Sequence, residues 1–207
     1  AKCPNIYECW NRKTATLMIL GDTCTRACKF CSVNTAAKPN WYDPLEPQRV
    51  AGFVKKVGLR HVVITSVDRD DLKNDYGANI WHDTVVAIHK LAKGCSVEIL
   101  TPDFRNYDPS LKKVFSSMPE IFSHNIECVK RISKTVRPQS CWKRSKNVLK
   151  KSIDYGLLTK TGLMVGLGET DAEVLDTMKE FAEIGVEIFN IGQYLQPTKK
   201  HLSVDRF

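Results

Sequence analysis

The chain contains the stretch Thr16-Leu17-Met18-Ile19-Leu20-Gly21-Asp22-Thr23-Cys24-Thr25-Arg26-Ala27-Cys28-Lys29-Phe30-Cys31, in which an apolar run leads into three cysteines. Short apolar runs rich in β-branched residues are typical of strands that are buried on both faces of a sheet. Similar runs recur along the chain and predict strands at residues 16–20, 61–67, 96–100, 121–126, 163–167 and 188–191. The three cysteines therefore follow the carboxyl end of the first predicted strand.

Helical patterns separate these predicted strands. Asp108-Pro109 is a favourable helix start, and Thr170 with Glu173 forms a capping box ahead of the last helix. The patterns predict helices near residues 50–57, 81–92, 108–115, 148–153 and 170–181. The expected buried faces are Val50, Phe53, Val54 and Val57 in the first of these helices and Val174, Leu175, Met178 and Phe181 in the last.

The alternation of strands and helices predicts an α/β fold with parallel strands and right-handed crossovers, either a doubly wound sheet or a barrel. No G-x-G-x-x-G follows the first strand, which disfavours a dinucleotide-binding sheet. Six βα units are fewer than the eight of a complete barrel. A six-unit barrel would therefore be open on one side, and in either arrangement the ligands gather at the carboxyl ends of the strands.

Composition limits the functional classes. The 207 residues are 43% hydrophobic, enough for one domain with its own core. The net charge of +8 is compatible with nucleic acid, an anionic surface or an acidic protein partner, but the charges are spread along the chain as on solvated helix faces. There is no run of about 18 apolar residues and no secretory pattern at the N-terminus. Clustered cysteines in such a chain favour metal binding and a reducing compartment.

The spacing C-x3-C-x2-C of Cys24, Cys28 and Cys31 is the most specific signal. Three thiolates can hold three irons of a four-iron cluster and leave the fourth iron open to a ligand. The alternatives are a structural zinc site, whose fourth ligand would come from elsewhere, and simple buried thiols. Zinc sites usually pair cysteines at x2 spacing, so the triplet favours the cluster.

With Phe30 as the aromatic residue, C-x3-C-x-aromatic-C after a first strand resembles the signature of the radical S-adenosylmethionine (SAM) superfamily. The resemblance implies a partial TIM barrel, (βα)6, an open parallel barrel over residues 16–207. In it, the amino and carboxylate groups of SAM chelate the open iron. Reduction then cleaves SAM to a 5′-deoxyadenosyl radical.

Further segments resemble the lipoyl synthase family across nearly the whole chain. They are residues 3–10, 21–26, 65–71, 101–104, 124–127 and 192–198. The resemblance implies sulfur insertion at C6 and C8 of a protein-bound octanoyl group, with two 4Fe–4S clusters and SAM as cofactors. It also implies octanoylated lipoyl domains of 2-oxoacid dehydrogenase complexes or the glycine cleavage H protein as substrates. An electron donor such as flavodoxin or ferredoxin would be a partner, without nucleic acid or membrane. The expected location is the bacterial cytoplasm or, alternatively, the mitochondrial matrix.

The second, auxiliary cluster of that family is held by C-x4-C-x5-C and a serine near the C-terminus. Cys3 and Cys9, in the N-terminal segment 1–15, match the C-x5-C part. The remaining cysteine would lie three positions before Ala1, and the serine-bearing segment would follow Phe207. We therefore expect a chain trimmed at both ends, in which SAM binding survives and sulfur insertion fails if nothing more exists.

The resemblance also assigns cofactor contacts. It implies that Ser66 and Asp68 bind the SAM amino group and that a glycine-rich strand lies near the adenine. The implied contacts are Phe30, Ser66, Asp68, Asn125, Glu127, Arg137, Gly162, Gly166 and Glu169. Each has a structural alternative: turn formation for the aspartate and glycines, a solvent-facing role for Arg137, and a buried, hydrogen-bonded ring for the neighbouring His124.

Two alternatives to this function remain: another sulfur-inserting enzyme of the superfamily, similar to biotin synthase, and a zinc-stabilised nucleic-acid-binding module. The second lacks aromatic residues interleaved on a basic face. Cys95, Cys128 and Cys141 lack ligand spacing and are expected in the core. Lys199-Lys200-His201 is either a solvated tail or a basic rim for an acidic lipoyl domain.

Overall fold

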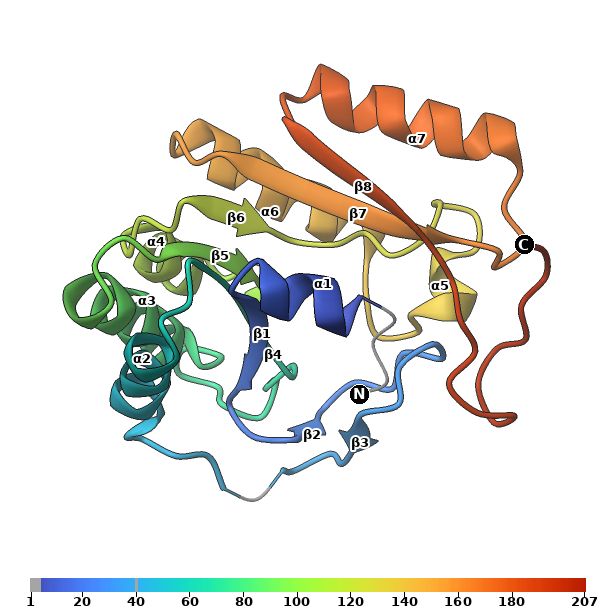
Figure 1. Ribbon diagram of the computed structural model, residues 1–207. Coiled ribbons are helices and arrows are strands. Elements are labelled where there is room, and N and C mark those ends of the chain that lie inside the picture. The colour runs from blue at the N-terminus through green and yellow to red at the C-terminus, as the bar shows by residue number, and fades with distance from the viewer. Residues whose placement is uncertain (1–4, 40) are drawn as a thin grey trace.

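The computed structural model describes residues 5–39 and 41–207. Its main sheet is entirely parallel, and its strands follow one another in chain order, so that β1 and β8 form the two edges. This order confirms the partial, open barrel (Figure 1). The strands are β1 (Thr14–Ile19), β4 (His61–Ser66), β5 (Ser96–Leu100), β6 (Ile121–Ser123), β7 (Thr159–Val165) and β8 (Ile188–Gln193).

Helices connect successive strands, as right-handed crossovers require. The longer ones are α2 (Glu46–Val57), α3 (Ala78–Leu91), α4 (Asp108–Phe115), α6 (Trp142–Asp154) and α7 (Asp171–Glu183). The short ones are α1 (Ile6–Asn11), which packs beside β1, the 3₁₀ turn η1 (Phe104–Asn106) and α5 (Ser133–Val136). The predicted helix start at Asp108-Pro109 and the Thr170–Glu173 capping box are both confirmed.

The strand register brings the carboxyl ends together on one rim. Ile19 of β1 pairs with Ser66 of β4, and Leu100 of β5 pairs with Ser123 of β6. A second, two-stranded sheet of β2 (Thr23–Cys24) and β3 (Asn34–Thr35) flanks the first cysteine. This small sheet was not predicted, because two-residue strands carry no periodicity. The loops after β1, β4, β5 and β6 therefore share the rim.

Two predicted strands differ from the structure by more than two residues at one end. The strand predicted at 121–126 ends at Ser123, and only Glu127 regains an isolated bridge, to Leu163. The strand predicted at 163–167 is β7, which starts at Thr159 and ends at Val165. The first half of β7 is polar, so the pattern of apolar runs did not predict it as a strand. Thr159 and Thr161 are buried with their hydroxyls hydrogen-bonded, and Lys160 pairs with Glu98 at 2.9 Å.

The predicted buried helix faces are partly wrong. Phe53 and Val57 are 41% and 40% exposed, because α2 turns Pro47, Ala51 and Val54 toward the sheet instead. In α7, Phe181 is buried as predicted, but Leu175 is 56% exposed, and Thr177 is the other buried residue. The main core lies between the outer face of the sheet and helices α2, α3 and α4, around the fully buried Trp81. A smaller core packs α6 and α7 against β7.

Candidate active site

A cavity of about 330 Å³ opens on the rim where the loops after β1, β4, β5 and β6 meet. Because the carboxyl ends of parallel strands lie at one edge, residues far apart in the sequence share this space. The structure brings most of the predicted site residues together in its lining. They are Cys24, Cys28, Phe30, Cys31, Ser66, Asp68, Asn125, Glu127 and Arg137.

The cysteine loop is joined to the loop after β4 by backbone contacts. The Cys24 Sγ accepts hydrogen bonds from the backbone N–H groups of Arg26, at 3.4 Å, and Asp68, at 3.3 Å. The Thr25 N–H and hydroxyl both donate to the Asp68 carbonyl at 2.9 Å. Cys24, Cys28 and Cys31 are all free thiols, not joined in disulfides. This set of thiols on one loop has the donor chemistry of an iron–sulfur site.

Burial favours the protonated form of two of these thiols, Cys24 and Cys28, because it raises their pKa values. It raises the pKa of Cys28 to about 11 and outweighs the nearby Arg137, which lowers it. The pKa of Cys24 is also raised by burial, with a further contribution from the Asp68 carboxylate. Thiolates rather than thiols bind metals, so a metal bound by Cys24 and Cys28 would displace their protons.

Two buried polar atoms in the cavity lining make no hydrogen bond to any described residue. One is Asp68 Oδ1, which lies 3.2 Å from Arg26 Nη1 without hydrogen-bond geometry. The other is Nε of Arg137, whose Nη1 donates to the carbonyls of Asn125 and Ile126. Burial raises the pKa of Asp68 to about 6 even though Arg26 lowers it. Such unpaired groups are what a ligand carrying both an ammonium and a carboxylate would satisfy.

The third part of the lining comes from the loop after β6. Burial raises the pKa of Glu127, the largest influence on that group. His124 is 1% exposed and lies 2.8 Å from the Thr101 carbonyl through Nδ1 and 2.9 Å from the Ser145 hydroxyl through Nε2. Burial lowers the pKa of His124 to about 4. The ring of His124 is therefore neutral and hydrogen-bonded where it lines the cavity. This agrees with the structural alternative for His124, a buried, hydrogen-bonded ring.

The glycine-rich strand lies only partly at this site. Gly162 lines an adjoining cavity of about 460 Å³ that shares Asn125 and Glu127 with the first. A Cβ at Gly162 would lie 3.1 Å from the Asn190 carbonyl, so β7 and β8 need glycine there. Gly166 and Glu169 lie outside both cavities. The Glu169 carboxylate closes their turn by accepting the N–H groups of Gly166, at 2.6 Å, and Leu167, at 2.9 Å.

The other cysteines are distributed unevenly. Cys9 is half-buried in α1, while Cys3 lies outside the described residues. Cys95 and Cys128 are buried as predicted. Cys141 is exposed, so its predicted place in the core is wrong; it precedes α6 at the surface. In the described part of the chain, no three His, Cys, Asp or Glu side chains converge on a point that could hold one metal ion.

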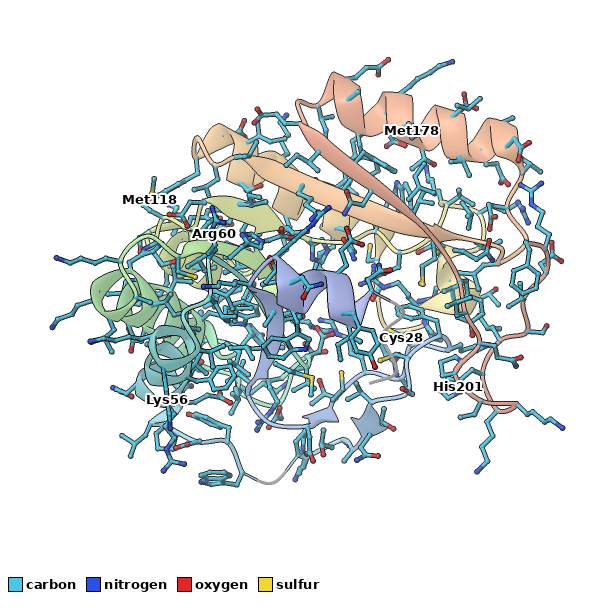
Figure 2. The ribbon with its side chains drawn as sticks, in the orientation of Figure 1. Cys28, Lys56, Arg60, Met118, Met178 and His201 are labelled. Atoms are coloured by element: carbon cyan, nitrogen blue, oxygen red, sulfur yellow. The ribbon has the colours of Figure 1, made fainter. Side chains whose placement is uncertain are left out.

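The segment after β8 returns to the outer side of the cysteine loop, and Figure 2 shows His201 near Cys28. His201 Nε2 lies 3.1 Å from the Cys31 carbonyl, and the Leu202 N–H donates to the Lys29 carbonyl. Lys199 and Lys200 are exposed beside them. Lys200 and His201 thus line a second hollow, which shares Cys28, Cys31 and Val33 with the cavity.

Sequence reasoning missed a set of buried charges beneath the cysteine loop. Arg26, Asp70, Asp103 and Arg144 form an ion-pair network there. The available signal was the recurrence of charged residues just after the first three predicted strands.

Comparisons with known proteins agree with this geometry. Residues 18–181 match the family model of the radical SAM superfamily. Over its whole length the chain is 52% identical to the lipoyl synthase of Rubrobacter xylanophilus and 49% identical to that of Halalkalibacterium halodurans. It spans 64% of the first relative's length and 69% of the second's.

Solved structures share the fold at low sequence identity. SuiB of Streptococcus suis bound to S-adenosylmethionine matches with a TM-score of 0.75 over 98% of this chain and 47% of that chain, at 11% identity. Methylornithine synthase (PylB) matches with a TM-score of 0.69 over 93% of this chain and 56% of that chain, at 14% identity. None of the helices in the described residues has the length and apolar character needed to cross a membrane.

Proposed function

The chain belongs to the lipoyl synthase family of the radical SAM superfamily, and we propose that it takes part in inserting sulfur at C6 and C8 of a protein-bound octanoyl group. One observation carries the proposal: three free thiols with the family's spacing line a rim cavity together with two buried polar atoms, Asp68 Oδ1 and Arg137 Nε, that make no hydrogen bond. The relatives' names favour this over a biotin synthase-like activity.

In this proposal Cys24, Cys28 and Cys31 hold three irons of a 4Fe–4S cluster and leave one iron open. Bound together, the cluster and SAM supply a carbon-centred radical, which can remove hydrogen from an unactivated C–H bond. The chain's own residues bind and orient. Asp68 Oδ1 is placed to accept from the SAM ammonium, and Arg137 Nε to donate to its carboxylate.

The lining also limits side reactions of a radical. Leu100, Val67 and Met18 contribute apolar surface between the polar groups. His124 offers no free proton, because both ring nitrogens are engaged within the protein.

We further propose that Cys3 and Cys9 are ligands of an auxiliary cluster that donates sulfur. Cys9 lies in α1, which packs beside β1 and so near the barrel's open edge. The resemblance assigns the remaining ligands to a further cysteine and a serine. An oxygen ligand matches iron less well than a thiolate does, which makes a serine ligand easier to release as the cluster is consumed.

The proposed protein substrate is an octanoylated lipoyl domain or glycine cleavage H protein, and the electron donor is flavodoxin or ferredoxin. Lys199 and Lys200 are exposed, and Lys200 lines a hollow that borders Cys28 and Cys31, so the two lysines can attract an acidic domain. Screening by salt should then raise the apparent KM for an acidic octanoylated domain. A KM that does not change with ionic strength would remove this role for the two lysines.

Anaerobic reconstitution tests the cluster directly. The chain should take up iron and sulfide, turn brown and bind SAM, whereas a variant with Cys24, Cys28 and Cys31 all replaced by Ser should lose the SAM-binding cluster. Replacement of Cys141, which is exposed and away from the cavity, is the matched control and should retain it. Wild-type protein that carries zinc, or no iron and sulfide after reconstitution, contradicts the proposal.

A further inference from the structure

Arg26 lies between the first two cysteines, yet its side chain points away from solvent and is 1% exposed. Its guanidinium contacts three carboxylates. It bonds both oxygens of Asp70 at 2.9 Å, and both oxygens of Asp103 at 2.6 and 3.0 Å, and it lies 3.2 Å from Asp68. Asp68 and Asp70 follow β4, whereas Asp103 follows β5. One side chain therefore links the cysteine loop to the next two loops of the rim.

The far side of this network is also anchored. Asp103 is fully buried and accepts a further hydrogen bond, at 2.6 Å, from Nε of Arg144 in α6. The Arg144 Nη2 donates to the Gln139 carbonyl, and the Gln139 side chain accepts from the Ala27 N–H. The contacts thus return to the cysteine loop at the residue after Arg26. Such closed, charged networks hold a single geometry because each group loses a buried partner if another moves.

Resting on the function proposed above, we infer that Arg26 is a positioning residue. It holds Asp68 and the cysteine loop in the relative positions that bind SAM. Four of the five guanidinium N–H groups are used on Asp70 and Asp103. Asp68 is held nearby by charge, and its Oδ1 keeps its acceptor capacity for the cavity. The Asp68 backbone N–H meanwhile donates to Cys24 Sγ, so one residue faces both the cluster thiol and the cofactor space.

Lysine cannot reproduce this arrangement. An ammonium is a point charge with three donors, whereas two bidentate carboxylate contacts need the planar fork of arginine. In Arg26→Lys, at least one of Asp70 and Asp103 should lose its pair of hydrogen bonds. The single ammonium would then be shared among three carboxylates, those of Asp68, Asp70 and Asp103. Asp68 would then be drawn into the network and away from the ligand.

Arg69 provides a matched control in the loop after β4. It is equally buried, with 1% of its side chain exposed, and makes a bidentate pair with Asp71 at 2.8 Å. Its remaining contacts are the Leu20 carbonyl and the Tyr42 ring, away from the cysteine loop. Arg69→Lys therefore measures how much stability and SAM affinity are lost when a buried arginine on this rim is replaced. It leaves the relative position of Asp68 and the cysteine loop unchanged.

The experiment compares wild type, Arg26→Lys and Arg69→Lys after anaerobic reconstitution. Iron and sulfide per chain, thermal stability and SAM affinity by equilibrium dialysis are measured. Arg26→Lys should weaken SAM binding by about tenfold, the size of one lost charged contact, at a similar iron content. Arg69→Lys should change SAM affinity by less than about twofold despite a comparable loss of stability.

The inference is overturned if Arg26→Lys binds SAM as wild type does, or if both variants lose affinity equally. Should Arg26→Lys fail to fold, Asp103→Asn is measured in its place. Asp103→Asn keeps the shape of the side chain at position 103 and the Arg26–Asp70 pair, and it should still weaken SAM binding severalfold. An unchanged affinity in Asp103→Asn would then reject the role. Failure of the proposed function is a separate result, since wild type would lack iron and sulfide.

Discussion

His124 shows how burial sets the chemistry of a single residue, and it predicts a pH effect. Its folded pKa of about 4 lies below the usual 6.5 because burial disfavours the imidazolium. Between these values the unfolded chain binds more protons than the folded chain, so this group makes the free energy of unfolding rise with pH. The contribution is complete above about pH 6.5 and is lost as the pH falls through about 4.

Asp68 acts in the opposite direction in the same window. Burial raises its pKa from 3.8 to about 6, so the folded chain takes up this proton first, and stability falls as the pH rises between those values. Total stability therefore does not isolate the histidine. Comparing wild type with His124→Gln isolates it. Between pH 4 and 6.5 the free energy of unfolding of wild type should include a contribution from His124 that rises with pH by up to about 3 kcal/mol, and the variant should lack that contribution. Identical pH slopes by urea denaturation would show that His124 does not titrate this way.

Two glycines of the turn after β7 make a matched pair. Both have left-handed backbone, with φ of +96° at Gly166 and +98° at Gly168. A Cβ at Gly166 would lie 2.6 Å from the Arg206 carbonyl oxygen, whereas at Gly168 it would meet open space. Gly168→Ala should cost about 1 kcal/mol of stability from backbone strain, and Gly166→Ala about 2–3 kcal/mol because crowding is added. Equal costs in chemical denaturation would mean that the backbone after β8 moves aside freely.

At the scale of an element, α7 depends on its amino-terminal cap. The Thr170 hydroxyl accepts from the Glu173 N–H at 3.2 Å, and the Glu173 carboxylate accepts from the Thr170 N–H at 2.9 Å. Arg131 and this cap lower the pKa of Glu173 to about 2. Thr170→Ala should cost about 1 kcal/mol, read as a lower urea midpoint, while Thr135→Ala at an exposed site in α5 should cost a few tenths. Equal effects would mean that tertiary packing alone holds the helix.

At the scale of the whole molecule, a charge pair joins strands across the barrel interior. Lys160 of β7 lies 2.9 Å from Glu98 of β5, with 19% and 8% of the two side chains exposed. Burial raises the pKa of Glu98, but His61 and Lys160 together lower it below its usual value. The carboxylate is therefore charged inside the open barrel and depends on its cations.

Removing one partner should be costly. Lys160→Met leaves Glu98 buried beside His61 alone and should reduce the free energy of unfolding by about 3 kcal/mol. Adding Glu98→Gln should recover part of that loss. The surface pair Lys146–Glu180, 2.7 Å apart and about one third exposed, is the control, and Lys146→Met should cost less than about 1 kcal/mol. Similar losses at the two sites would show that water reaches the interior pair.

Local patterns alone determined the alternation of parallel strands and helices, the cysteine loop after the first strand and the cap of α7. Periodicity, spacing and capping each involve residues within a few turns of one another, so the sequence contains them directly. The grouping of the cysteines with Ser66, Asp68 and Asn125 also followed, because parallel strands place their carboxyl ends on one rim.

Only the tertiary structure decided which charges meet. Arg26 finds Asp70 and Asp103 at separations of 44 and 77 residues, and Lys160 finds Glu98 at 62. The polar start of β7 can lie in the sheet because Lys160 pairs with Glu98. Leu175 is exposed because α7 is rotated so that Thr177 and Phe181 face the sheet. These outcomes depend on strand register and helix rotation, which arise from packing between distant segments and leave no local pattern.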